Sequence, residues 1–244
     1  MARIFITGSS DGLGLLAAQA LVGEGHRVVL HGRNETRGRE ALSKLPGAEA
    51  VVTGDLGIIE ETELLAEKIN AIGHFDAVIH NAGLFHAPAN DLFTVNTLTP
   101  YILTCLIQKP KRLIYLSSDM HTSGRAKLES FKTGPGRLNY SDTKLHVLML
   151  CKVVARHWKE IYANAVNPGW VPTKMGGRTA PDSLEAGYQT QVWLATSNDE
   201  NAKVNGRYLY HQKESVYNPQ ADDEQLQEQF ISLCQEITGV TFPV

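Results

Sequence analysis

Two side chains suited to proton chemistry, Tyr140 and Lys144, lie four residues apart in this chain. In a helix this spacing brings both to one face, one turn apart. A nearby ammonium favours the phenolate, so Lys144 is expected to lower the pKa of Tyr140 from its usual value of about 10 toward neutrality. Tyr140 is therefore a candidate proton donor or acceptor for an alcohol–carbonyl pair. Taken alone, the pair also fits an ordinary solvated helix face.

A glycine-rich turn near the start of the chain gives the pair its context. Residues 3–7 form an apolar run suited to a buried parallel strand, and Gly8, Gly12 and Gly14 follow it. The last of them opens a helical pattern that Gly25 closes. Strand, glycine turn and helix in succession are typical of a dinucleotide site, where the helix start offers N–H groups to a pyrophosphate. This context favours a nucleotide site over an ordinary glycine turn.

A cationic residue follows the second predicted strand, residues 26–30. About twenty residues past the glycine turn, an NAD site usually places an acid on the ribose 2′-hydroxyl. Here Arg33 stands at that place, with Asn34 beside it. A guanidinium suits a 2′-phosphate, which predicts NADP rather than NAD. A solvated surface arginine is the alternative, and Asp11 inside the glycine turn argues against a phosphate nearby.

Strand and helix patterns continue to alternate along the chain. Further strands are predicted at residues 51–53, 75–80, 113–116, 163–167 and 206–210, and helices at 58–71, 91–106, 140–154, 183–196 and 222–237. This order predicts a three-layer Rossmann fold, in which a doubly wound parallel sheet of about seven strands has helices on both faces. No linker or repeat divides the chain, so residues 1–244 are expected to form a single domain.

The carboxyl ends of the predicted strands gather polar and glycine residues. Asp55, which could accept from an adenine amino group, Asn81 to Gly83, Ser118 and Pro168 all fall at such ends. Ligands of open α/β sheets bind in the crevice beyond these ends. The long segment of residues 121–139 leads into the Tyr140 helix and is expected to border the substrate entrance.

Composition excludes several other functions. The net charge is -3 with mixed signs, so no nucleic acid or acidic membrane surface is indicated as a partner. Three scattered cysteines suit a reducing compartment and form neither a disulfide framework nor a zinc site. No metal spacing joins the histidines, although His121, three residues past Ser118, could touch a substrate. No apolar stretch is long enough for a membrane span, and the first strand starts too early for a signal peptide, so a cytoplasmic protein is expected.

The helix that carries Tyr140 is apolar nearly all round through Val154. Such a helix is buried on more than one side. The sheet is expected to cover one side and a partner subunit another, which predicts a homo-oligomer built through residues 140–154.

Together these motifs resemble the short-chain dehydrogenase/reductase family over essentially the whole chain. The matching residues are Thr7-Gly8-x-x-x-Gly12-x-Gly14, Asn81-Ala82-Gly83, Ser117-Ser118, Tyr140-x-x-x-Lys144 and Pro168-Gly169. Within the family the chain is most similar to the retinol-dehydrogenase and WW-domain-oxidoreductase-like group, through Gly32-Arg33-Asn34 with Arg37-Gly38, Glu185-Ala186-Gly187-Tyr188-Gln189-Thr190 and Asn205-Gly206-Arg207-Tyr208. The resemblance implies NADP as cofactor and an alcohol, aldehyde or ketone substrate of lipophilic character.

The family comparison also implies roles for single residues. Tyr140 would be the general acid in reduction and the base in oxidation, Lys144 would bind the nicotinamide ribose, and Ser118 would orient the substrate carbonyl. Asn96 would hold a water behind Lys144 in a proton relay. Cofactor contacts would come from Gly8, Ser10, Gly12, Leu13, Gly14, Arg33, Asn34, Asp55, Leu56, Asn81, Ala82, Gly83, Tyr140, Lys144, Pro168, Gly169, Val171 and Thr173, and no metal site is implied.

Two departures from the family pattern leave alternatives open. The segments on either side of Asn96 are short for the family, which leaves open whether Asn96 keeps its role. The region after Thr173 is compact, which predicts a small lid and an open pocket.

A nucleotide-binding regulator or scaffold without turnover is the alternative to an oxidoreductase, and a sugar-nucleotide epimerase is a weaker one. The intact set of Ser118, Tyr140 and Lys144 favours the enzyme, because a regulator has no need of a lysine-activated phenol.

Overall fold

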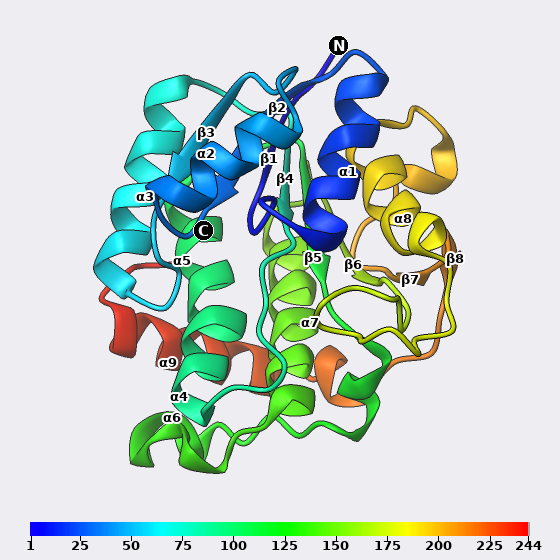
Figure 1. The fold of residues 1–244 in the computed structure, drawn as a ribbon. Coiled ribbons are helices and arrows are strands. Elements are labelled where there is room, and N and C mark those ends of the chain that lie inside the picture. The colour runs from blue at the N-terminus through cyan, green and yellow to red at the C-terminus, as the bar shows by residue number, and fades with distance from the viewer. Residues whose placement is uncertain (244) are drawn as a thin grey trace.

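Short apolar strands form the middle layer of the protein, whose computed structural model describes residues 1–243 (Figure 1). The strands are β1 (Arg3–Ile6), β2 (Arg27–Gly32), β3 (Ala50–Thr53), β4 (Ala77–His80), β5 (Arg112–Leu116), β6 (Tyr162–Asn167), β7 (Tyr208–Tyr210) and β8 (Lys213–Glu214). The helices are α1 (Gly12–Gly23), α2 (Glu35–Lys44), α3 (Ile59–Ile72), α4 (Ala89–Phe93), α5 (Thr99–Leu106), α6 (Glu129–Thr133), α7 (Tyr140–His157), α8 (Leu184–Thr196) and α9 (Glu224–Thr238). A π-helical turn, Thr94–Leu98, joins α4 to α5.

Within the described residues the sheet has eight strands in the order β3-β2-β1-β4-β5-β6-β7-β8. All neighbours are parallel except β7 and β8. The strand order reverses at β1, so a crevice is expected beyond the carboxyl ends of β1 and β4. The predicted doubly wound sheet is confirmed, with one strand more than expected. That strand, β8, has two exposed residues, so no apolar pattern marks it.

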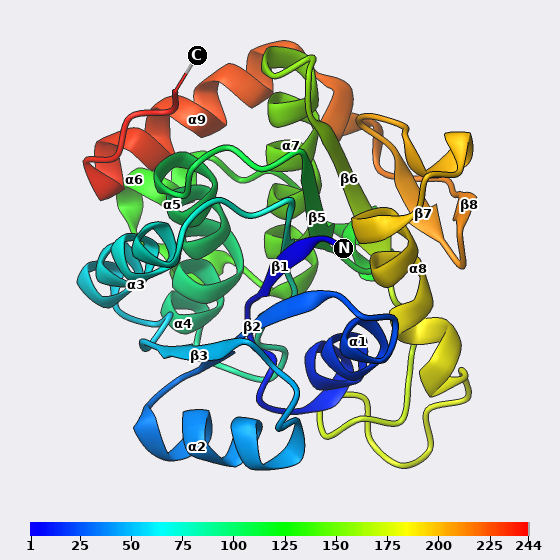
Figure 2. The same cartoon turned by 90° about the horizontal axis from the view of Figure 1, so that it is seen from above.

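Helices cover both faces of the sheet, as Figure 2 shows from above. One apolar cluster lies between the sheet and α1, α2 and α8, and it includes Leu21, Ala41 and Leu194. The other lies between the sheet and α3, α5 and α7, and it includes Leu65 and Leu148. The α/β class and the three layers follow from these two cores.

Helix α7 is buried within the single chain. Every residue from Ser141 to Cys151 is buried, because α7 packs against β6 on one side and against α9 on another. The apolar surface attributed to a partner subunit is therefore covered by the chain's own α9. The reason for predicting a homo-oligomer through residues 140–154 was wrong.

Residues 240–243, which follow α9, close the core beside α5 and α7. The hydroxyl of Tyr101 donates to the carbonyl oxygen of Val240 over 2.6 Å, and Trp158 Nε1 donates to that of Pro243 over 2.7 Å. The ring of Phe242 stacks on Trp158, with 5.2 Å between centroids. The two buried aromatic donors are thereby satisfied.

Two segments differ from the expectation. Helix α2 has no apolar stripe, since only Gly38 and Ala41 are buried in it, so its sequence gave no helical period. Residues 121–139, expected as a loop, contain the end of one 3-10 turn, Asp119–Ser123, then α6 and a second 3-10 turn, Pro135–Arg137.

Candidate active site

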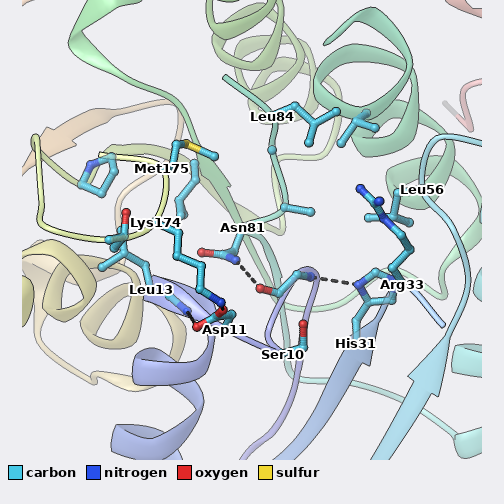
Figure 3. A pocket seen from close by; sticks show the side chains of 18 of the residues that line it. Ser10, Asp11, Leu13, His31, Arg33, Leu56, Asn81, Leu84, Lys174 and Met175 are labelled. Carbon is cyan, nitrogen blue, oxygen red and sulfur yellow. Dashed lines mark hydrogen bonds and ion pairs between the residues drawn. The ribbon is translucent and has the colours of Figure 1, made fainter. Parts of the chain in front are cut away.

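A cavity of about 330 Å³ opens where the strand order reverses, and Figure 3 shows the side chains around it. It is lined by the glycine turn, by residues that follow β2, β3 and β4, and by the start of α7. The predicted cofactor residues that line it are Gly8, Ser10, Gly12, Leu13, Arg33, Asp55, Leu56, Asn81, Ala82, Gly83, Tyr140, Lys144, Pro168 and Thr173. Residues in the lining that the sequence did not indicate are His31, Leu84, Val95, Leu116, Ser117, Lys174 and Met175.

The glycine turn requires glycine for two different reasons. Gly8 and Gly12 have φ values of 63° and 55°, in the left-handed region. Gly14 sits at a close contact, because a Cβ there would lie 2.4 Å from Nδ2 of Asn81 and 2.6 Å from the Gly8 carbonyl oxygen. Helix α1 therefore starts directly behind the turn, and Gly12 at its N-terminus lines the cavity. Free N–H groups and the helix dipole favour an anion at this point.

His31 fastens the glycine turn to the neighbouring strands. Its buried ring accepts the Gly8 N–H at Nδ1 over 3.0 Å (Figure 3). Its Nε2 lies 2.9 Å from the carbonyl oxygen of Gly54. Because a carbonyl only accepts, the ring carries its proton on Nε2. Burial lowers the pKa of His31 to about 4, so the ring is neutral at pH 7. The only sign of this role in the sequence is a polar residue at the end of an apolar strand.

Asp11, which argued against a bound phosphate, is neutralised by two cations. Lys174 pairs with its carboxylate, and Nη2 of Arg37 lies 3.5 Å from Oδ2. The hydrogen bond from Lys174 lowers the pKa of Asp11. Arg37 also lies 3.4 Å from the hydroxyl oxygen of Ser10. Arg37 also pairs with Glu40 over 2.7 Å, so the charges of this group balance and Asp11 carries no uncompensated negative charge.

Arg33 stands at the rim of the cavity beyond β2, with its side chain 62% exposed. Its Nε lies 3.9 Å from a carboxylate oxygen of Asp55, which also accepts the Gly57 N–H. Asn34 lies outside the cavity lining, and its side chain accepts the Arg37 N–H at 3.0 Å. Asn34 therefore caps α2 and does not face the cavity, whereas Arg33 lines it.

Tyr140 and Lys144 both line the cavity because α7 begins at Tyr140. A capping box fixes this start: Asn139 and Asp142 each accept the backbone N–H of the other at 3.0 Å. The ammonium nitrogen of Lys144 lies 5.5 Å from the centre of the Tyr140 ring. The two side chains thus share one helix face, as their spacing predicts.

The pKa values of this pair differ from the prediction. Burial raises the pKa of Tyr140 to about 12, although the hydroxyl of Ser118 lowers it in part. Burial lowers the pKa of Lys144 to about 8, and its ammonium donates to the carbonyl oxygen of Leu116 over 2.7 Å. The predicted lowering of the Tyr140 pKa by Lys144 is wrong for the polypeptide alone, because removal of the phenol from water has the larger effect.

The two serines at the end of β5 have different surroundings. Ser117 is buried, and its hydroxyl donates to the carbonyl oxygen of Lys144 over 2.8 Å, which ties the strand to α7. Ser118 is partly exposed, and its hydroxyl donates to Asp119 over 3.1 Å. Ser118 lowers the pKa of Tyr140, but it is Ser117, and not Ser118, that lines the cavity.

Asn96 lies in the π-helical turn and outside the cavity lining. Its side chain accepts the N–H of Leu84 over 2.8 Å, and donates to the carbonyl oxygen of Leu84 over 2.9 Å and to Thr143 over 3.1 Å. A Cβ on Gly83 would lie 3.2 Å from Nζ of Lys144 and 3.4 Å from Oδ1 of Asn96. Asn96 therefore holds the chain that follows β4 and shares a neighbour with Lys144.

The loop after β6 brings only some of its predicted residues to the cavity. Pro168 and Thr173 line it, whereas Gly169 and Val171 do not. Gly169 has a φ of 81° and forms a tight turn beside Asp182. Val171 is buried, and these two residues shape the loop instead of lining the cavity.

Two expectations about the substrate side have different outcomes. His121 is fully buried, its Nε2 accepts the Asn218 N–H, and its ring packs edge-on against Tyr208, so a substrate cannot reach it. Among the described residues, none from 121 to 139 lines the cavity, and α6 packs against α9, so the expectation that this segment borders the substrate entrance stays a prediction.

Residues 1–243 contain no group of three or more histidine, cysteine, aspartate or glutamate side chains arranged to hold a metal ion. In the same part of the chain, no helix has both the length and the apolar character needed to cross a membrane. The buried histidines instead bond within the protein, as His146 does with Thr97 and Ala126.

Comparison with known proteins identifies the family. The family model described as short chain dehydrogenase matches residues 2–106. An uncharacterized oxidoreductase of Emericella nidulans is 43% identical over 100% of this chain and 99% of its own length. The short-chain dehydrogenase chyC of Penicillium rubens is 41% identical, with both chains covered in full. Retinol dehydrogenase 14 of Mus musculus is a more distant relative, 26% identical over 97% of this chain and 86% of its own.

Solved structures share the fold. An uncharacterized protein from Mycobacterium paratuberculosis superposes with a TM-score of 0.85 at 22% identity, over 100% of this chain and 96% of the other. A blue fluorescent protein from a metagenomic library, in complex with NADPH, superposes with a TM-score of 0.70 at 20% identity, over 85% and 95% of the two chains. With whole-length relatives above 40% identity, the chain belongs to the short-chain dehydrogenase/reductase family and is an NAD(P)-dependent oxidoreductase.

Proposed function

We propose that the protein interconverts an alcohol and a carbonyl compound with NADPH as the preferred cofactor and Tyr140 as general acid and base. One observation carries the proposal: Tyr140 and Lys144 line the same cavity as Gly8 and Gly12 of the glycine turn. A dinucleotide held by the turn would therefore extend to the phenol. The cofactor would supply the hydride, and the polypeptide would supply the proton.

The lining residues fit a dinucleotide. A Cβ on Gly12 would meet only Thr173, at 4.0 Å, so the backbone of the turn faces open space. The pyrophosphate would lie at the start of α1, near Arg37 and Lys174, and the adenine amino group near Asp55. Pro168 and Thr173 would cover the nicotinamide, while Lys144 would bind its ribose.

The protonation state of the site at neutral pH suits the proton donation that reduction requires. With a pKa of about 12, Tyr140 is protonated at pH 7 and can donate to a carbonyl oxygen. Ser118 would orient that oxygen and share its developing charge. The ammonium of Lys144 would stabilise the phenolate left behind. Asn96, which shares the neighbour Gly83 with Lys144, would hold the water that returns a proton through Lys144.

Replacing Arg33 with alanine is expected to raise the Kd for NADPH roughly tenfold and to leave that for NADH unchanged. A charge-assisted contact to phosphate is worth about 1.5–3 kcal/mol, and the exposure of Arg33 favours the lower end of this range. Fluorescence titration with each nucleotide measures both constants. Arg39→Ala is the matched control, because it removes the same charge from the exposed side of α2. Equal affinities of the unmodified protein for both nucleotides would contradict the 2′-phosphate site.

Replacing Gly14 with alanine is expected to weaken NADPH binding by at least about tenfold. The new methyl group would lie 2.6 Å from the backbone carbonyl of Gly8 and must displace the turn. Gly23→Ala in the last turn of the same helix is the control, since a Cβ there meets nothing within 4 Å. Titration with NADPH measures the Kd of both variants. Equal Kd values for the two would show that the turn does not hold the cofactor.

A screen of aldehydes, ketones and alcohols, followed by NADPH absorbance, tests the reaction itself. The ring of Phe85 lies edge-on to Tyr140 at 4.7 Å, and Trp170 and Met175 are exposed near the loop after β6, which favours lipophilic members of the panel. Tight NADPH binding without turnover of any member would support the alternative of a nucleotide-binding regulator or scaffold.

A further inference from the structure

Asp119 is an exposed carboxylate next to the hydroxyl that would hold the substrate carbonyl. It directly follows Ser118 at the end of β5, and the Ser118 hydroxyl donates to its Oδ1 over 3.1 Å. When the Ser118 hydroxyl turns its single proton to a carbonyl oxygen, that oxygen lies within about two hydrogen-bond lengths, roughly 6 Å, of this carboxylate. A group attached to the reacting carbonyl carbon would come within its reach.

Asp119 has no cationic partner, unlike three other acids near this edge of the sheet. Asp11, Asp55 and Asp142 each pair with an arginine or a lysine. Within residues 1–243, no ion pair joins Asp119 to any lysine, arginine or histidine, and its side chain accepts only the hydroxyl of Ser118. An ionised carboxylate accepts about four hydrogen bonds, so most of its capacity is free for a ligand.

A buried phenol beside this carboxylate also has free capacity. Tyr208 is 2% exposed, and its hydroxyl oxygen has no hydrogen-bond partner in the described part of the chain. Its ring packs edge-on against His121, two residues past Asp119, with 4.6 Å between centroids. Burial is the largest cause that raises the pKa of Tyr208, and the charges of Asp119 and Tyr140 add to it. Tyr208 therefore lies against the 3-10 turn that carries both Asp119 and His121.

We propose that Asp119 selects the substrate by the group next to the reacting carbonyl. The inference rests on the proposed function, because Ser118 and Tyr140 must hold that carbonyl. A neighbouring amide, amine or hydroxyl donates an N–H or O–H to the carboxylate, whereas a neighbouring carboxylate meets a like charge without a cation to offset it. The substrates are thus uncharged or cationic carbonyl compounds with an adjacent hydrogen-bond donor, and 2-oxo acids are rejected.

Three probes with the same reacting ketone separate charge from hydrogen bonding: benzoylformamide, methyl benzoylformate and benzoylformate. The amide offers a donor, the ester offers none, and the acid carries a negative charge. Their reduction is followed by NADPH absorbance, and their binding to the enzyme–NADP⁺ complex is measured by calorimetry, so that the ranking does not depend on turnover. For the wild type, kcat/KM and affinity are expected to be higher for the amide than for the ester. Both are expected to be higher for the ester than for the acid by at least about tenfold, or about 1.4 kcal/mol.

Two variants of Asp119 separate the contribution of its charge from that of its hydrogen bonding. Asp119→Asn is expected to raise kcat/KM for the acid, relative to that for the ester, by at least about tenfold. The change should come mainly through a lower KM for the acid, because the substitution removes the charge and keeps the shape. Asp119→Leu is expected to remove the preference for the amide as well. Glu160→Gln is the matched control, since it removes one exposed carboxylate before β6, at the opposite end of the strands. This control is expected to keep the wild-type ranking.

The outcomes distinguish this inference from the proposed function. If the wild type with NADP⁺ binds acid and amide equally, binds none of the probes, or keeps its ranking in Asp119→Asn, the role of Asp119 is overturned while the proposed function stands. If the protein binds neither NADPH nor NADP⁺, the proposed function is overturned and the inference with it.

Discussion

Tyr140→Phe is expected to lower kcat by about 10²- to 10⁴-fold, the usual contribution of a general acid, and to leave the Kd for NADPH within about twofold. The variant removes only the hydroxyl. The ring contacts with Phe85 at 4.7 Å and with Lys144 at 5.5 Å remain, so the fold and the cavity are preserved. Steady-state kinetics with a carbonyl found in the screen measures kcat, and fluorescence titration measures NADPH binding.

Tyr162→Phe provides the control for this experiment. Tyr162 starts β6 at the amino end of the strands, where its ring lies beside the guanidinium of Arg112. Loss of this hydroxyl is expected to leave kcat unchanged. Full turnover by Tyr140→Phe would show that another group donates the proton, and a parallel loss of NADPH affinity would indicate a structural role for the phenol.

Acidification is expected to destabilise the protein steeply below about pH 6.5. Burial lowers the pKa of His31 to about 4, that of His80 to about 3 and that of His146 to about 4. In the unfolded chain each ring takes up a proton near pH 6.5, whereas in the folded chain it stays neutral until about pH 4. The unfolded state therefore binds up to three more protons around pH 5. The free energy of unfolding should fall there by about 4 kcal/mol per pH unit, a large part of a typical stability.

Urea unfolding between pH 7 and pH 4.5 measures this slope, and His80→Phe tests its origin. The His80 ring stacks on Tyr115 at 4.8 Å, and its Nδ1 has no hydrogen-bond partner within residues 1–243. A phenyl ring keeps the stacking and removes one proton-binding group, so the slope should fall by about one third. An unchanged slope in His80→Phe would place the acid sensitivity in other groups.

The elements that the sequence predicted are those with a strong apolar pattern. Runs such as residues 3–7 and 113–116 correspond to buried strands β1 and β5, and the stripe of residues 222–237 corresponds to α9. Helix α2 and strand β8 were missed because contacts with neighbouring elements hold them while most of their surface faces solvent. A pattern read along the chain carries no sign of such contacts.

The candidate site was predictable where its chemistry is local in sequence. The glycine turn and the pair of Tyr140 and Lys144 lie within single motifs. Three features were not predictable: the bond between His31 and Gly8, the pairing of Asp11 with Lys174, and the raised pKa of Tyr140. Each depends on tertiary packing, since the first joins residues 23 positions apart, the second joins residues 163 positions apart, and the third follows from burial.

The closure of the core by residues 240–243 has a consequence during synthesis. Tyr101 and Trp158 receive their hydrogen-bond acceptors only when these residues have left the ribosome. Until then the nascent chain exposes the apolar surface around α5 and α7 to the crowded cell, where chaperones bind such surfaces. Completion of this core is therefore a step that follows translation of the preceding 239 residues.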